Sequence, residues 1–415
     1  MTRDIPDETF LHVDINSYFA TLAQQETPAL RGKPVGIIKD VGRTCIIAAS
    51  KEAKQFGIKT GERLKDARQK CPDIITVPAQ FDMYLSATKD LRRVFASLAP
   101  DVEVFSLDES FINFTPLRKL YPSPQEFGYE LQTQIKKTLG EWVTCNVGIS
   151  YNRFLAKMSG EVSPKGSITE VTPLNRDALL ARVAFSDVCG IGMRLERKLR
   201  LLNVTTPFQI NFIETEVLLS LFGPFWTKEL QKMARGDEPL FLTRIDQNPH
   251  MKSVSRSITL FSLSKEQDHI KRVLYNLATE VMHKVRRMDL AGRVIGVYLR
   301  GDGPNSWGTY VTLRRHINHL SEYFDILWNQ LISQWNDHFP VIKFVVYLGL
   351  LEPMQQVPQP ILPDYWKQER VARAVDSLSK KYGLFTVRSG LFLNQEIIKP
   401  EVTGYLGDKL YQFMD

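Results

Sequence analysis

The first 150 residues alternate between two hydrophobic periods, one typical of strands and the other typical of helices. Runs rich in apolar and β-branched residues predict strands at residues 10–15, 34–38, 44–49, 102–114 and 143–150. Helical spacing of apolar residues predicts helices at residues 17–26, 51–56 and 126–139. The order strand, helix, strand, strand, helix, strand predicts a split βαβ domain, with residues 18–81 inserted into it.

The following segment, residues 172–242, has a largely helical pattern and predicts a small separate helical domain. Prolines and glycines interrupt this pattern at Pro207, Gly223, Gly236 and Pro239. Residues 188–204 place a Gly-x-Gly turn before a basic amphipathic helix, an arrangement similar to a helix-hairpin-helix.

The last third of the chain returns to mixed strand and helix signals after a polar connector. Strands are predicted at residues 253–261, 293–300, 310–313 and 342–350, with a long helix at residues 265–288. An α/β domain with an exposed sheet fits this pattern. Residues 351–363 are rich in Pro and Gln and predict a linker, and a final helix is predicted at residues 366–382.

Length, composition and charge add limits on function. A chain of 415 residues predicts two to four folding units, and 43% hydrophobic residues are ordinary for a globular protein. A net charge of +7 permits nucleic-acid binding without proving it. Four single cysteines, a polar N-terminus and the lack of any run of about 18 apolar residues predict a reduced, cytoplasmic protein outside the membrane.

Three carboxylates are the strongest candidates for chemistry. Asp14 ends the first predicted strand, and the pair Asp108 and Glu109 lies inside a later strand of the same predicted sheet. Carboxylates that converge can hold two Mg²⁺ ions about 3.5–4 Å apart. Strict alternation would send Asp108 and Glu109 to opposite faces, so both reach a metal only near a strand end or a local twist. Surface charges or turn formers are the alternative interpretation.

Several motifs occur in the order typical of one family. They are HVDINSYFA at residues 12–20, GKPVGI at 32–37, EAKQFGIKTG at 52–61, SLDESFINF at 106–114, VGISYNRFLAKMSG at 147–160, VCGIG at 188–192 and KSVSRSITL at 252–260. Together they resemble the Y-family of translesion DNA polymerases, and the resemblance covers roughly residues 10–353.

The resemblance implies an α+β multidomain fold with a split βαβ palm, inserted fingers, a helix-hairpin-helix thumb and an α/β little finger. The predicted domains are the palm at 8–17 and 82–171, the fingers at 18–81, the thumb at 172–242, a linker at 243–251, the little finger at 252–353, and a linker with a helical tail at 354–415. The implied activity is low-fidelity, template-directed addition of dNTPs to a primer 3′-hydroxyl. Asp14, Asp108 and Glu109, with the backbone carbonyl of Ile15, are the implied ligands of two Mg²⁺ ions.

The nucleotide site implied by the resemblance is partly altered. Phe19 falls at the sugar-selecting position, where an aromatic ring excludes a 2′-hydroxyl. Lys51 and Lys54 replace the usual Tyr and Arg that bind the triphosphate, and the family's Lys-Pro-x-Gly reads Ser-Pro-Lys-Gly, so Lys165 is the candidate substitute.

Primer-template DNA is the main partner that the resemblance implies. Gly190 and Gly192 are expected to present backbone N–H groups to a phosphate, with Lys198 nearby. In the C-terminal domain, Lys252 and Arg256 are predicted to contact the DNA backbone. Residues 359–362, beginning at Gln359, come close to a sliding-clamp peptide but lack its aromatic ending, and an accessory subunit is a further candidate partner.

Two other functions stay open at this level. A catalytically weak, polymerase-like protein that binds DNA and recruits other bypass factors is favoured mildly by the altered triphosphate residues, while the intact acids argue against it. A two-metal phosphodiester hydrolase would share the acids but leave Phe19 and the C-terminal match unexplained.

Overall fold

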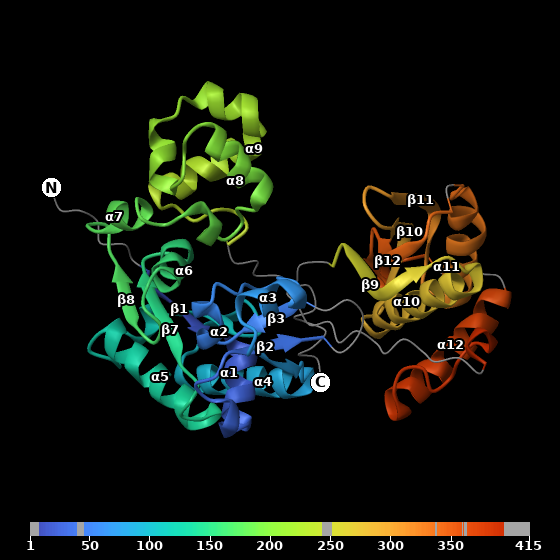
Figure 1. The fold of residues 1–415 in the computed structure, drawn as a ribbon, viewed down its shortest axis with the longest axis horizontal. Coiled ribbons are helices and arrows are strands. Elements are labelled where there is room, and N and C mark those ends of the chain that lie inside the picture. Colours follow the sequence, from blue (N-terminus) through green and yellow to red (C-terminus); the bar gives the residue numbers. More distant parts are fainter. Residues whose placement is uncertain are drawn as a thin grey trace. The chain divides into compact units, whose positions relative to one another are not determined.

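A computed structural model of the chain describes residues 8–39, 45–242, 251–336, 338–358, 360 and 363–393. These residues form two compact units, the first within residues 8–38 and 45–242 and the second within residues 251–393 (Figure 1). Among the described residues, no helix is both long enough and apolar enough to cross a membrane.

The first unit is built on a five-stranded sheet in the order β5-β6-β1-β7-β8. Its strands are β1 (Phe10–Ile15), β5 (Val102–Val104), β6 (Glu109–Asn113), β7 (Cys145–Ser150) and β8 (Ile168–Val171). The central strand β1 pairs antiparallel with both β6 and β7, whereas β7 and β8 run parallel. The strands predicted at 10–15 and 143–150 are confirmed within two residues. The single strand predicted at 102–114 is wrong, because the chain turns at residues 105–108 between β5 and β6.

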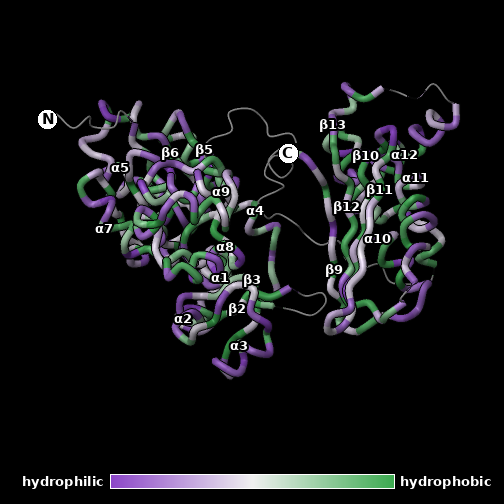
Figure 2. The backbone as a smooth tube through the Cα atoms, turned by 90° about the horizontal axis from the view of Figure 1, so that it is seen from above, coloured by the Kyte–Doolittle hydropathy of each residue, from purple (hydrophilic) through white to green (hydrophobic). Residues whose placement is uncertain are grey.

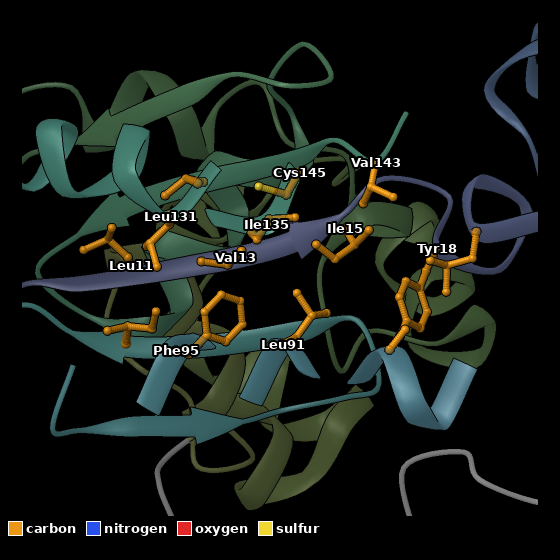
Figure 3. Close-up of a cluster of buried hydrophobic side chains, with 14 of the residues drawn as sticks. Leu11, Val13, Ile15, Tyr18, Leu91, Phe95, Leu131, Ile135, Val143 and Cys145 are labelled. Atoms are coloured by element: carbon orange, nitrogen blue, oxygen red, sulfur yellow. The ribbon is translucent and has the colours of Figure 1, made fainter. Parts of the chain in front are cut away.

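Alternating residues of β1 serve the two faces of this sheet. On one face α4 (Phe81–Leu98) and α5 (Pro124–Leu139) supply the core. Figure 3 shows the side chains that meet there: Leu11, Val13 and Ile15 of β1, Leu91 and Phe95 of α4, and Leu131 and Ile135 of α5. The residues between them, His12 and Asp14, therefore face the other side, which α6 (Arg153–Glu161) covers.

The approach of α6 to the sheet depends on Gly148 of β7. A Cβ atom at residue 148 would lie 1.9 Å from the carbonyl oxygen of Ala156 and 2.8 Å from the backbone nitrogen of Gly160. Both are backbone atoms of α6, so no side-chain rotation could relieve the overlap. Glycine at this position therefore sets how close α6 comes to β1.

The segment between α1 (Tyr18–Glu26) and α4 carries a second, three-stranded sheet in the order β3-β2-β4. Its elements are β2 (Val35–Ile38), β3 (Ile46–Ala49), α2 (Lys51–Gln55), α3 (Leu64–Lys70) and β4 (Ile75–Pro78). They enclose a small apolar cluster of their own that includes Ile46, Ala53 and Ala67. The helix predicted at 51–56 is confirmed, and Gly57 follows it with a φ of 75°, as expected for a left-handed residue after a helix.

The helical part of the first unit contains α7 (Arg176–Leu180), α8 (Met193–Leu201) and α9 (Thr215–Arg235). Their apolar residues share one core with the outer side of α6, where Phe154, Leu155 and Met158 are fully buried. Helix α9 is broken at Gly223, whose φ of 72° and ψ of 173° lie outside the helical region just before Pro224. Helix α6 is thus packed between the sheet and the helical segment.

The second unit is a four-stranded antiparallel sheet in the order β11-β10-β12-β9. Its elements are β9 (Ser253–Ser264), α10 (Gln267–Arg287), β10 (Leu290–Arg300), β11 (Ser306–Ile317), α11 (Leu320–Asp325), β12 (Val341–Gly349), β13 (Glu352–Pro353) and α12 (Pro363–Tyr382). The helices lie on one side of the sheet (Figure 2).

The predicted tail is attached to this unit by ion pairs. Arg286 of α10 binds Glu369 of α12 at 2.9 Å and Asp376 of α12 at 2.7 Å. The region predicted as a linker also contains β13, which pairs with β10. The predicted α/β domain and the final helix are confirmed, whereas the predicted domain boundaries stay a prediction.

Replacing Gly148 with alanine should separate α6 from the sheet. We expect Gly148→Ala to destabilise the protein by about 3 kcal/mol, because overpacking against rigid backbone has no cheap relaxation. Gly160→Ala is the matched control from the same contact, since its Cβ would meet nothing closer than 3.7 Å. Thermal unfolding followed by circular dichroism measures both variants. Equal melting temperatures for the two variants would contradict this account of the packing.

Candidate active site

Three carboxylates from separate parts of the chain converge on one side of the central sheet. Asp14 of β1 lies directly opposite Glu109 of β6 in the antiparallel register, so their side chains share a face. Glu161 of α6 joins them, and one carboxylate oxygen of each of these three residues lies within 4.8 Å of the other two. The donors are all hard oxygens, which are the ligands that Mg²⁺ prefers.

Asp108 reaches the same site because it stands just before a strand and not inside one. The backbone N–H of Ile15 donates to the carbonyl oxygen of Asp108 at 3.1 Å, which ties the turn to the end of β1. The hydroxyl of Ser106 lies 2.5 Å from the Asp108 carboxylate and accepts a hydrogen bond from the N–H of Glu109 at 3.1 Å. The difficulty raised by strict alternation is thereby removed.

A cavity of about 560 Å³ opens at this cluster. The predicted site residues that line it are Asp14, Ile15, Phe19, Lys54, Asp108, Glu109 and Lys165. Lys51 is the exception among the residues predicted for nucleotide binding. Its ammonium group lies over the Trp142 ring at 4.6 Å and 3.8 Å from the Glu52 carboxylate, and it does not line the cavity.

The buried cation of the cluster is Lys157 of α6. Its ammonium group donates to Oε2 of Glu109 at 2.9 Å and to Oε1 of Glu161 at 3.4 Å. Burial would lower the pKa of Lys157, but the carboxylates of Glu109 and Glu161 outweigh burial and raise it. Burial acts to raise the pKa of Glu109, yet the His12 ring and Lys157 beside it lower that pKa to about 2.

Asp14 and Asp108 lack comparable compensation. Burial first, and then the carboxylates of Glu109 and Asp108, raise the pKa of Asp14 to about 8. The pKa of Asp108 is also raised, mainly by burial. Four acids therefore line this cavity with three lysines, of which only Lys157 is buried, a charge balance that a divalent cation would improve. The donor set fits such an ion.

Phe19 is held rigidly at the edge of the same cavity. The chain leaves β1 through Ser17, which adopts a left-handed conformation with φ 51° and ψ 43°, and α1 begins at once. The Phe19 ring then stacks on the Tyr84 ring of α4, with centroids 4.1 Å apart and planes 12° from parallel. Only 6% of Phe19 is exposed, so its ring has a single packed position.

The sequence that carries this site is similar to that of known proteins. The impB/mucB/samB family description matches residues 13–161, and the C-terminal domain of that family matches residues 251–360. The first match contains every acid of the cluster. DNA polymerase IV of Moorella thermoacetica is 29% identical over 387 residues, which cover 91% of this chain and 94% of that protein. DNA polymerase IV 1 of Bacillus subtilis is 26% identical over 405 residues, which cover 96% of each chain.

A solved Y-family DNA polymerase chimera shares the fold, with a TM-score of 0.70 and 22% sequence identity over 83% of this chain and 99% of that chain. The chain belongs to the Y-family of translesion DNA polymerases. The predicted fold class and the predicted enzyme class, a DNA-directed DNA polymerase, are both confirmed.

The predicted phosphate-binding turn of this Y-family polymerase has the expected glycines. Gly190 adopts a φ of 88°, and the Phe241 ring occupies the space where a side chain at residue 190 would lie. Gly192 precedes α8, and a Cβ atom at this residue would meet no other atom within 4 Å. Lys198 of α8 is not simply exposed, because it donates to the carbonyl oxygen of Leu221 at 2.6 Å. Their contacts with DNA stay a prediction.

Of the two C-terminal residues predicted to contact DNA, one is poorly placed for that role. Lys252 is exposed just before β9. Arg256 instead pairs through register with the buried Val346 of β12 and lies 3.4 Å from the Glu280 carboxylate of α10. Its side chain is 10% exposed and faces the helices. Alternation along β9 places Arg256 on the covered face, and its contact with DNA stays a prediction.

The clamp-binding prediction at residues 359–362 falls largely outside the described part of the chain, which includes only Pro360 of that peptide. Three residues of the site were not identified from sequence: His12, Lys157 and Glu161. A signal for the last two existed, since Lys157 and Glu161 lie four residues apart on one face of a helix whose other residues after Arg153 are small or apolar.

Removing the Lys157 ammonium should leave the carboxylates of Glu109 and Glu161 without their buried partner. We expect Lys157→Met to lower the free energy of unfolding by about 3–5 kcal/mol in metal-free buffer, the range for breaking a buried ion pair. Arg93→Met is the control, because the ion pair of Arg93 with Asp90 lies at the surface and should cost less than about 1 kcal/mol. Urea unfolding in EDTA measures both, and equal costs would contradict the assignment.

Proposed function

We propose that this polymerase transfers dNTPs onto a primer 3′-hydroxyl opposite a DNA template, with low fidelity and past damaged template bases. The supporting observation is that Asp14 of β1, Asp108 of the turn before β6 and Glu109 at the start of β6 converge in one cavity. Three lysines also line this cavity: Lys54, Lys157 and Lys165. The predicted palm, fingers, thumb and little finger, with the boundaries given above, are part of this proposal.

Asp14, Asp108 and Glu109, with the carbonyl oxygen of Ile15, are the residues proposed to hold the metal ions, and Glu161 is an additional candidate. Two Mg²⁺ ions bound there would activate the primer hydroxyl and offset charge on the triphosphate and the departing pyrophosphate. The protein contributes rigidity, because the strand register fixes Asp14 against Glu109 and the Ser106 turn fixes Asp108.

Lys54 and Lys165 are the residues proposed to bind the triphosphate. Lys54 follows β3 on α2, and Lys165 follows α6, so they come from separate elements of the first unit. Burial first, and then the ammonium group of Lys165, lower the pKa of Lys54. Two ammonium groups close enough to affect each other would be stabilised by a polyanion between them. Lys51 is not part of this proposal because it lies against Trp142.

Phe19 is proposed to select deoxyribose. Because the ring is stacked on Tyr84 and buried in the α1–α4 contact, it cannot swing away to admit a 2′-hydroxyl. The ring therefore acts as a fixed wall of the nucleotide site and not as a flexible contact.

Primer extension by the full chain tests the proposed function. With Mg²⁺ and dNTPs we expect template-directed extension, and we expect Asp14→Asn to reduce its rate at least about 100-fold, which corresponds to about 3 kcal/mol in the barrier. Phe19→Ala should admit rNTPs while keeping dNTP incorporation. Retained DNA binding without any extension by the wild-type protein would favour the accessory-protein alternative, and template cleavage would favour the hydrolase.

A pair of lysine variants on the same helix tests the triphosphate site. Lys54→Ala should raise the KM for dNTP about tenfold or more, since a hydrogen bond to a charged group contributes about 1.5–3 kcal/mol. Lys51→Ala is the matched control and should change the KM less than about twofold, because Lys51 lies outside the cavity. Steady-state primer extension measures both constants. An unchanged KM for Lys54→Ala would remove this residue from the proposed role.

A further inference from the structure

His12 is a buried polar residue that the proposed mechanism does not use. It lies on β1 two residues before Asp14 and therefore on the same face of the sheet. Only 1% of the residue is exposed, and neither ring nitrogen has a hydrogen-bond partner within the described chain. Burying an imidazole that makes no hydrogen bond costs free energy, and a role of His12 in the acid cluster would explain why a polar residue lies here.

The surroundings of His12 direct one ring nitrogen toward the acid cluster. In the strand register His12 lies between Phe111 of β6 and Gly148 of β7, and its ring centroid is 4.8 Å from that of Phe111. Nε2 lies 3.6 Å from Oε2 of Glu109. That separation is beyond a hydrogen bond, but a shift of about 0.5 Å would bring it into the usual range.

Lys157 donates a hydrogen bond to the same oxygen of Glu109. Its ammonium group lies 2.9 Å from Oε2, so the hydrogen bond of Lys157 and the nearby Nε2 of His12 both lie at Oε2. Glu109 is thus held by one oxygen from the protein side. A carboxylate held in this way presents its other oxygen to a cation in a fixed direction, which is the usual role of residues that support metal ligands.

We propose that His12 is a positioning residue for metal binding: with Lys157 it fixes Oε2 of Glu109, through an Nε2–H donor, so that Oε1 is directed at the divalent cations. The assignment of the proton to Nε2 follows from the carboxylate beside that nitrogen. This inference rests on the proposed function, because it assumes that Glu109 binds the metal.

Mn²⁺ binding by the full chain, followed by electron paramagnetic resonance without DNA or nucleotide, tests the inference. We expect His12→Phe, which keeps the ring but has no donor, to weaken Mn²⁺ binding at least about tenfold, as for other residues that support metal ligands. His12→Gln, whose amide N–H can donate to the same oxygen, should stay within about threefold of the wild type. Melting temperatures in EDTA report whether each variant is folded.

If phenylalanine is not accommodated, His12→Met provides a second variant without a donor, and the comparison of Gln with Met decides. Wild-type affinity in a folded Phe or Met variant overturns the inference, and so does equal weakening by Gln and by Phe or Met. The proposed function fails separately, if the wild-type protein neither binds Mn²⁺ nor extends a primer.

Discussion

Four carboxylates around a single buried ammonium group are the constraint on which the rest of this structure depends. Asp14, Asp108, Glu109 and Glu161 would repel one another if nothing held them, and Lys157 is the buried cation that offsets them. Their convergence is maintained by backbone: a strand register, a serine turn and a helix that approaches the sheet over a glycine. The fold thus supplies the energy that keeps unfavourable charges close, which is the condition for binding divalent cations.

The hydrophobic core and the acid cluster lie on opposite faces of the same strand, β1. Alternate residues of β1 either pack against α4 and α5 or face α6, so the residues that anchor β1 also aim Asp14. Hydrogen bonds through α4 also link the core to the turn that carries Asp108. Tyr18 shares a hydrogen bond with Thr88, and the Thr88 hydroxyl donates to the carbonyl oxygen of Leu107 at 2.8 Å, next to Asp108. Core packing and site geometry are therefore coupled through a few buried polar contacts.

Much of the fold around the acid cluster could be predicted from sequence because it depends on local sequence patterns. The strand at 10–15, the helix after it and the acids at 14, 108 and 109 follow from short-range pattern and motif. The placement of Lys51 and Arg256 could not be predicted from charge alone, since their surroundings come from distant residues: Trp142 for the first and Glu280 of α10 for the second. The strand at 102–114 was wrong because apolar content hid a turn that Ser106 stabilises.

The roles of His12, Lys157 and Glu161 depend on tertiary contact more strongly still. Nothing local marks His12, because its role arises from Glu109 on a strand that is far away in the sequence. Lys157 and Glu161 reach the acid cluster because Gly148 allows α6 to pack closely on the sheet.

The proposed function depends on carboxylates that converge on divalent cations. Anomalous diffraction from crystals of the full chain with primer-template DNA, an incoming dNTP and Mn²⁺ would locate those cations. We expect anomalous peaks within about 2.5 Å of carboxylate oxygens of Asp14, Asp108 and Glu109. A dNTP bound in the cavity with no anomalous peak among these three residues, or with manganese held elsewhere, would contradict the proposed function.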